Sequence, residues 1–443
     1  SMVATQQYYL SHLTEVNKSN TIILAEDVFN DRGVLVVKKG GEVNKIFAQK
    51  IAKHKLLKPI DHSISLTSTL NQRTLFDFYS RSLDNMKLSN IVRHNGMRND
   101  ALEAFHLLNQ YPLIIQKLTI LAERMPEVLK SSLLTSVMAL SLCRELKLSK
   151  QTAECVFVAG VIANVGLLHI DPLIVNKKGH YTQDERNLMK GHVVIAKYFA
   201  DSVPSLHKLV AKAVLEHHER ADGFGYPFAK QASQLGIEGQ ILAMVDKVNA
   251  IYQKLVRDGP HSWTSVIAVI QVPSTAHAAP LNNAMMRVLK GFSVKYEAAF
   301  SKLEFKKLVK KCIVKRERLH LWFREFARIY NEHPTLMVES VNFKPLALLH
   351  QLEYTVNNSG VLNEALHTWL VQLPENLLEA DCLDVEEFAL VLDEVEYQCV
   401  FVMRKLGAAK DEFAKRFDDP ELADLYYQGL TCILDPNSNN SFK

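Results

Sequence analysis

The sequence has few of the features that define secreted, membrane-spanning or nucleic-acid-binding proteins. Its six cysteines are scattered without a CxxC pair, which argues against a disulfide framework or cysteine-based zinc site and suits a reducing cytoplasm. A net charge of +4 over 443 residues gives no reason to expect nucleic acid as a partner. The longest apolar run, Cys155 to Ala163, is far shorter than the roughly 20 residues that span a bilayer. Because no basic-then-apolar secretion signal is present either, we expect a cytoplasmic protein without a transmembrane segment.

The residue pattern changes along the chain and predicts a mainly α-helical protein. Two β-branched runs, residues 21–25 and 34–37, flank a turn signal at residues 30–33, and a polar stretch over residues 62–74 follows as a linker. From about residue 75 onward the pattern is helical. The predicted organisation is a small N-terminal α/β module (1–65), a helical connector (66–128), a helical domain (129–295) and a C-terminal helical extension (296–443).

Two segments of opposite charge lie in the predicted C-terminal extension. The predicted amphipathic helix 302–318 carries a basic face made of Lys302, Lys306, Lys307, Lys310, Lys311, Lys315, Arg316 and Arg318. Residues 372–396 contain nine acidic side chains and no Lys or Arg. The basic face is either simply solvated or binds one of three partners: anionic lipid, nucleic acid, or the acidic segment of the same chain or of a neighbour.

The most informative stretch is residues 217–227, which read His-His-Glu-Arg-Ala-Asp-Gly-Phe-Gly-Tyr-Pro. Adjacent side chains on a helix point about 100° apart, so two neighbouring imidazoles converge on one ion only near a helix end or across a broad cavity. The turn that follows contains Asp222, Gly223, Gly225, Tyr226 and Pro227. Both glycines permit a positive φ and the proline fixes the exit. Two interpretations of the turn follow: it has a purely structural role through its shape, or it presents Tyr226 and backbone N–H groups to a ligand or partner.

Further motifs occur in a fixed order around this stretch. They are Gly160 to Leu167, then Ile174, Asn176-Lys177 and Gly179, then Thr182 to Glu185 with Met189 and His192, and finally Ala243 to Asp246. Over roughly residues 129–258 this series resembles the HD-GYP family, bacterial metal-dependent phosphodiesterases that open cyclic di-GMP. The resemblance implies an HD-GYP-like helical domain as the central part of the fold.

The same resemblance implies a site that lacks part of its chemistry. His192, His217 and His218 match imidazole ligands and Asp246 matches a carboxylate ligand, whereas the family's His-Asp pair is Ala163-Asn164 here. Two further positions are degenerate: Leu167 stands in place of a phosphate-binding lysine, and a further ligand position near Leu133 is apolar. The remaining candidates for phosphate contacts are Lys254 and Arg257. Two divalent ions about 3.7 Å apart repel by about 18 kcal/mol at a dielectric near 20, and an amide at position 164 brings no charge to offset this. The sequence therefore predicts at most one divalent ion (Fe, Mn or Zn) on the three histidines. The alternative is a histidine cluster without metal, in which Asp246 is a helix cap or buried partner.

Three functions follow as expectations from the resemblance and its defects. The first is a catalytically impaired HD-GYP-like signalling protein that binds cyclic di-GMP, partner proteins of that pathway, or both, and influences biofilm formation or motility. The second is a phosphodiesterase or other hydrolase that works with a single metal ion. The third is a protein-interaction scaffold without nucleotide binding. The sequence does not indicate an oligomeric state.

Overall fold

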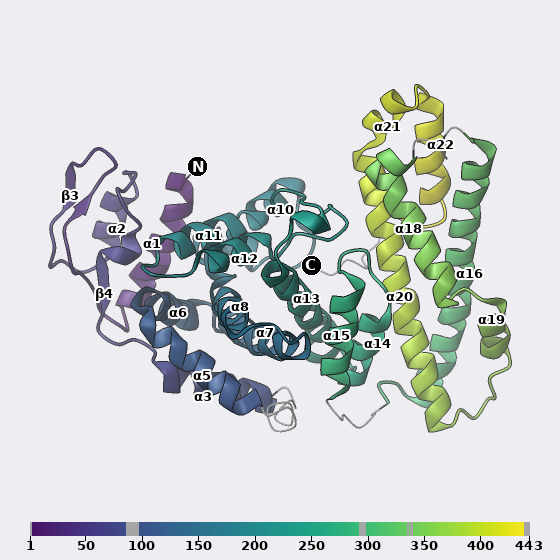
Figure 1. Ribbon diagram of the computed structural model, residues 1–443, viewed down its shortest axis with the longest axis horizontal. Coiled ribbons are helices and arrows are strands. Elements are labelled where there is room, and N and C mark those ends of the chain that lie inside the picture. Colours follow the sequence, from purple (N-terminus) through teal and green to yellow (C-terminus); the bar gives the residue numbers. More distant parts are fainter. Residues whose placement is uncertain (1, 86–96, 292–297, 335, 337–339, 438–443) are drawn as a thin grey trace. The chain divides into compact units, whose positions relative to one another are not determined.

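The computed structural model describes residues 2–85, 97–291, 298–334, 336 and 340–437. The chain forms two compact units, residues 1–246 with 287–292 and residues 247–286 with 293–443. It passes from the first unit to the second inside helix α13 (Ile237–Tyr252). Figure 1, coloured along the sequence, shows helices almost throughout, and every strand of the described residues lies before residue 67. The predicted mainly α fold is confirmed, while the division into four predicted domains stays a prediction.

The N-terminal part of the first unit is a small module of short strands and two helices. Its elements are α1 (Met2–Asn17), β1 (Ile22–Leu24), β2 (Val28–Phe29), β3 (Leu35–Val37), α2 (Lys45–Ile51) and β4 (Ile64–Leu66). The β2–β3 pair is antiparallel, and its turn is held by the Asn30 side chain, which accepts hydrogen bonds from the N–H groups of Arg32 and Val34. Strand β4 pairs with β1 although its polar surroundings predict a linker. Ile64 and Leu66 are buried and Ser65 is exposed, the alternation of a strand with one face on the core.

The rest of the first unit is helical. Its elements are α3 (Gln72–Asn85), α5 (Met97–Leu107), α6 (Pro112–Arg124), α7 (Pro126–Glu145), α8 (Lys150–Ile162), η3 (Val165–His169), α9 (Pro172–Val175), α10 (Gln183–Lys190), α11 (His192–Ser202), α12 (Lys208–Glu216) and the start of α13. Helix α7 packs along α8, and α11 packs along α12 (Figure 1). By length and composition, one described helical stretch, Lys150–His169, could cross a membrane, but 67% of it is buried inside the protein. Such burial is typical of a core helix.

A buried polar cluster connects the N-terminal module to the helical body of the first unit. The Lys117 ammonium lies 3.2 Å from a carboxylate oxygen of Asp61 and 3.0 Å from Nε2 of His169. Tyr9 donates its hydroxyl hydrogen to Asp61 and stacks on His169, with ring centroids 4.4 Å apart. Because Lys117 and Asp61 are both buried, each depends on the other for compensation of its charge.

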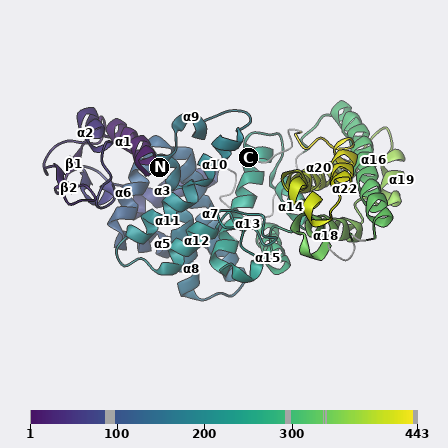
Figure 2. The same cartoon turned by 90° about the horizontal axis from the view of Figure 1, so that it is seen from above.

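The second unit is built from long helices that lie side by side (Figures 1 and 2). Its elements are the π-helical turn η5 (Gln253–Arg257), α14 (Trp263–Gln271), most of α15 (Ala279–Lys290), α16 (Lys302–Glu332), α18 (Lys344–Ser359), α19 (Glu364–Val371), α20 (Glu379–Ala408), α21 (Lys410–Arg416) and α22 (Pro420–Thr431). Helix α16 packs against α20 and α22, and α18 also packs against α20. The predicted helix 302–318 continues to Glu332 because its apolar stripe continues through Leu319, Trp322 and Phe326, all of which are buried.

The structure divides the predicted basic face of α16. Arg316 is fully buried, so its assignment to that face is wrong; it donates to the carbonyl oxygen of Leu362 at 2.8 Å and to Glu364 at 3.2 Å. Lys315 forms ion pairs with Asp393 and Glu396 of α20, which are part of the predicted acidic segment. The acidic segment of the same chain is therefore the partner of Lys315, and the other cations of the face have a different environment.

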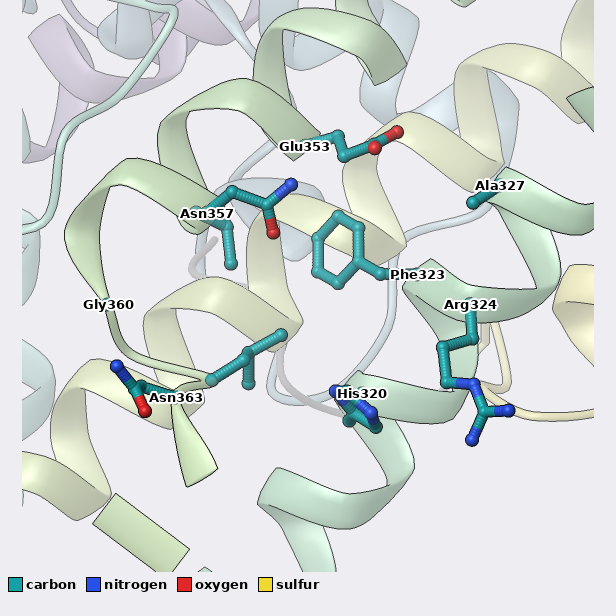
Figure 3. Close-up of a pocket in the computed structure, with 10 residues that line it drawn as sticks. His320, Phe323, Arg324, Ala327, Glu353, Asn357, Gly360 and Asn363 are labelled. Carbon is teal, nitrogen blue, oxygen red and sulfur yellow. The ribbon is translucent and has the colours of Figure 1, made fainter. Parts of the chain in front are cut away.

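The second unit also contains a pocket of about 350 Å³ between α16, α18 and the turn after α18 (Figure 3). Figure 3 shows Glu353 and Asn357 on one side, Arg324 and His320 on another, and the ring of Phe323 between them. The lining residues include none of the site residues that the sequence predicts. The three histidines of the predicted site lie in the first unit.

Candidate metal centre

Three histidines from two helix ends come together in the first unit. His192 is the first residue of α11, while α12 ends at Glu216, so that His217 caps it and His218 follows. One ring nitrogen from each histidine lies within 4.8 Å of the others. This confirms that the adjacent pair converges at a helix end. A turn at Gly191 separates α10, which carries Met189, from α11, which begins at His192.

Hydrogen bonds fix the tautomer of two of these rings. Nδ1 of His192 lies 2.7 Å from the carbonyl oxygen of Met189, and Nδ1 of His217 lies 2.6 Å from that of Val214. A carbonyl oxygen only accepts, so each Nδ1 carries the hydrogen and each Nε2 keeps a lone pair. Both Nε2 atoms are buried and have no hydrogen-bond partner in the described structure. Ligation through one ring nitrogen, with the other held by a carbonyl, is how proteins orient a metal-binding histidine.

The electrostatic surroundings keep the three rings neutral. Burial lowers the pKa of His192, and burial followed by repulsion from its neighbouring histidines lowers the pKa of His217 well below its usual value. Burial and then His192 lower the pKa of His218 in the same way. A neutral imidazole is the form that binds a metal ion. The donor set therefore fits a single divalent ion held by His192, His217 and His218, without the need to remove protons near neutral pH.

The predicted carboxylate ligand lies beside this group. An oxygen of Asp246, on α13, is 3.8 Å from Nδ1 of His218, and 38% of the Asp246 side chain is exposed. Asp246 is not part of the three-residue cluster with mutual ligand distances below 4.8 Å. The structure thus shows Asp246 as an electrostatic neighbour of His218, and its role as a ligand stays a prediction.

The degenerate positions lie on the segment that follows α8. Ala163 is buried, and the amide nitrogen of Asn164 donates to the hydroxyl of Ser132 on α7 at 3.4 Å. Gly166, in η3, packs so closely on α11 that an added Cβ would lie 2.1 Å from the carbonyl oxygen of His192. Leu167 follows in the same turn and is half-buried. The segment is therefore placed against His192, but residues 163, 164 and 167 bring no charge to it.

The turn after the histidines is held by a carboxylate that sequence analysis missed. Glu219 is buried and accepts hydrogen bonds from the N–H groups of Phe228 at 2.7 Å and Lys230 at 2.9 Å. These two bonds close residues 219–230 into a loop. The sequence shows only that the motif contains a Glu at position 219. It does not show that this carboxylate accepts hydrogen bonds from backbone N–H groups nine and eleven residues further on.

The two glycines of this loop have different functions. Gly223 adopts φ +79°, a conformation that glycine permits without strain. Gly225 does not lie in the left-handed region, but a Cβ at Gly225 would lie 2.4 Å from the backbone nitrogen of Arg220. Gly225 is thus required for close approach of two backbone segments. Asp222 pairs with Arg220 at 2.8 Å and accepts from the N–H of Phe224, which fixes the start of the turn.

The loop also places an aromatic ring on the histidine cluster. Tyr226 stacks on His218, with ring centroids 4.9 Å apart and planes 19° apart, and its peptide bond to Pro227 is cis. The ammonium of Lys190 lies 5.4 Å from the centre of the Tyr226 ring. The loop's shape is thus fixed internally and sets Tyr226 against His218, while its role towards a ligand or partner stays a prediction.

The two predicted phosphate contacts lie in the second unit. Arg257 forms an ion pair with Asp258 at 2.9 Å. Burial lowers the pKa of Lys254, and the carboxylates of Asp393 and Glu394 oppose that effect. Both cations thus have acidic neighbours in their own unit, and a contact of either with phosphate stays a prediction.

Comparison with known proteins places this cluster in a family context. Residues 117–277 match the family model described as an HD domain. A cyclic di-GMP phosphodiesterase of Pseudomonas aeruginosa is 26% identical over 140 residues, which is 31% of this chain and 33% of that protein. The cyclic di-GMP phosphodiesterase response regulator RpfG of Xanthomonas campestris pv. campestris is 30% identical over 121 residues, 27% of this chain and 32% of RpfG. The 3'3'-cGAMP-specific phosphodiesterase 1 of Vibrio cholerae is 26% identical over 130 residues, 29% and 30% of the two chains. Each match spans about a third of the relative's length.

Proposed function

Because this chain carries an HD domain of the HD-GYP-like kind, we propose that it is a catalytically impaired member which binds cyclic di-GMP on a single-metal centre. The observation that carries the proposal is the pair of buried Nε2 atoms of His192 and His217, which have no partner in the described structure. An unsatisfied buried acceptor costs about 1–3 kcal/mol, and coordination of an ion would remove that cost for both rings. When bound, such an ion supplies a Lewis acid for a phosphate oxygen.

Impairment follows from the residues that surround the histidines. A second ion needs a bridging carboxylate to offset its repulsion from the first, and the side chains at positions 163 and 164 are a methyl group and a neutral amide. The amide nitrogen of Asn164 is directed to Ser132. Leu167 has no charge with which to hold a phosphate. Binding without efficient hydrolysis is therefore the behaviour that these residues support.

The choice of ligand comes from the relatives. Those compared above are named as phosphodiesterases of cyclic di-GMP or 3'3'-cGAMP, two cyclic dinucleotides. We assign cyclic di-GMP as the ligand, with partner proteins of its signalling pathway as the output and biofilm formation or motility as the processes affected. The ring of Tyr226, stacked on His218, is the group of the loop best placed to sense an occupied centre.

A second candidate is a hydrolase that uses one metal ion. It is favoured by the carboxylate of Asp246, which lies 3.8 Å from His218 and is partly exposed, so that it could take a proton from an attacking water. The third candidate, a scaffold without nucleotide binding, is favoured by Leu167 and Leu255, which stand where the resemblance places phosphate-binding cations. Turnover separates the second candidate from the first, and absence of cyclic di-GMP binding separates the third.

The first test is metal binding by the full chain. After reconstitution with Mn²⁺, Fe²⁺ or Zn²⁺, we expect about one ion per chain by elemental analysis, and His217→Ala should lower the affinity at least tenfold. The matched control is His180→Ala, because His180 is exposed and outside the cluster. Equal metal content in the His217 and His180 variants would refute the single-metal centre.

The second test is calorimetric titration of the reconstituted protein with cyclic di-GMP, with turnover followed by chromatography of the nucleotide. Micromolar or tighter binding without product supports the proposal. Steady product formation that disappears in His217→Ala and in Asp246→Asn would establish the one-metal hydrolase instead. No binding heat with a fully loaded metal centre would leave the scaffold.

A further inference from the structure

The outward face of α16 combines apolar and basic side chains in one stripe. At 100° per residue, Leu303, Val314 and Leu321 point within about 20° of one another and extend over about 27 Å of helix. Their side chains are unusually accessible for their type, at 66%, 60% and 45% exposed. The opposite side of the helix is buried against the rest of the second unit, as at Phe305 and Cys312. The three apolar groups are thus centred on the side that faces away from the core.

Five cations flank these apolar side chains. They are Lys306, Lys307, Lys310, Lys311 and Arg318, and all five are exposed. Viewed down the helix axis, each points within about 80° of the direction of Leu303. Among the ion pairs of the described residues, none involves these five side chains. The acidic residues on the exposed part of the helix are few: Glu304 closes the capping box at the helix start, and Glu317 lies 3.5 Å from the buried Arg316. The stripe is therefore strongly cationic.

We infer that this stripe, Leu303 to Leu321, is a docking surface for a membrane that contains anionic phospholipid. A helix that combines lysines with exposed aliphatic side chains can place the latter at the headgroup boundary while the ammonium groups bind lipid phosphates. The acidic segment of the same chain is not the occupant, because α20 packs on another side of α16 through Lys315. Nucleic acid is less suited, because the stripe offers no aromatic ring for base stacking and its leucines have no role against phosphates.

The lysines and the aliphatic residues make separate contributions that can be measured. Each basic residue near an anionic surface increases partitioning about fivefold. In co-sedimentation of the full chain, we expect binding to phosphatidylcholine vesicles only when they contain phosphatidylglycerol. The double variant Lys307→Gln/Lys310→Gln should bind about 25-fold more weakly. The control Lys50→Gln/Lys53→Gln removes the same charge from exposed positions of α2 and its C-terminal flank, and should bind as the parent does.

A second pair of substitutions separates membrane from other partners. Leu303→Ser/Val314→Ser should weaken vesicle binding while leaving the elution volume and the circular dichroism of the protein unchanged. Equal binding to neutral vesicles, or equal losses in both lysine pairs, would overturn the proposal. Binding of RNA or duplex DNA that depends on Lys307 and Lys310 but not on Leu303, without vesicle binding, would assign the stripe to nucleic acid. A dimer that Leu303→Ser/Val314→Ser dissociates would assign it to a second copy of the chain.

Discussion

The protonation of His12 should make the first unit unstable in mild acid. His12, on α1, is 4% exposed, and its Nδ1 accepts a hydrogen bond from Nε of Arg124 at 3.0 Å, so the ring is neutral with its hydrogen on Nε2. Burial, then the charges of Arg124 and Lys117, lower the pKa of His12 from 6.5 to about 4. The folded form therefore binds the proton more weakly than the unfolded form does.

The sign and size of the effect follow from this difference. The contribution of His12 is fully present above pH 6.5, is lost progressively as the pH falls towards 4, and does not change further below that. A pKa difference of this size corresponds to about 3 kcal/mol of unfolding free energy. His169, whose pKa burial lowers well below its usual value, adds to the loss in the same direction. The parent protein should thus lose stability steeply across this range.

The assay is urea unfolding of the full chain at several pH values, with the transition of the first unit identified by hydrogen-exchange mass spectrometry. The variant His12→Asn keeps an acceptor for Arg124 but cannot be protonated, so its unfolding free energy should fall about 3 kcal/mol less than that of the parent between neutral pH and pH 4. His180→Asn, at an exposed site, is the control. Parallel curves for the parent and His12→Asn would refute the reasoning.

Two other predictions concern the same unit. Lys117→Met leaves the buried carboxylate of Asp61 without its cation and should lower the unfolding free energy in urea by about 3–5 kcal/mol. The double variant with Asp61→Asn should recover most of that loss, and equal stability of the single and double variants would contradict this reasoning. Gly166→Ala forces a Cβ against the backbone of His192 and should weaken metal binding at least tenfold, while Gly41→Ala, where a Cβ meets nothing within 4 Å, should not. Unchanged metal affinity in Gly166→Ala would show that η3 does not position that histidine.

Local patterns in the sequence were sufficient for several parts of the structure. The capping box at Thr182 is present, because it depends only on residues within one helical turn. The hairpin turn at residues 30–33 forms for the same reason. The convergence of His217 and His218 was also predictable, since the glycine-rich turn after them ends the helix.

Other features depend on partners distant in the sequence. Arg316 belongs to a basic run, yet the continuation of the apolar stripe into the next turns buries it, where Leu362 and Glu364 accept its hydrogen bonds. Strand β4 (Ile-Ser-Leu) lies within a mostly polar stretch, and its pairing with β1 completes a two-stranded sheet that the composition of the stretch does not indicate. The role of Glu219 depends on the fold of the loop, which brings the N–H groups of residues 228 and 230 to its carboxylate.

The sequence by itself determined the helical class, the order of the motifs and the identity of the three imidazoles, because periodicity, turn residues and side-chain chemistry are local properties. The family resemblance groups His192 with the other two, and the tertiary structure adds that one ring nitrogen of each lies within 4.8 Å of the others and that two Nε2 atoms are buried without a partner among the described residues. Only the tertiary structure decided which cations of α16 are buried or paired and which remain at the surface. Burial and the pairing of polar groups depend on packing between segments far apart in the chain, and no local pattern encodes them.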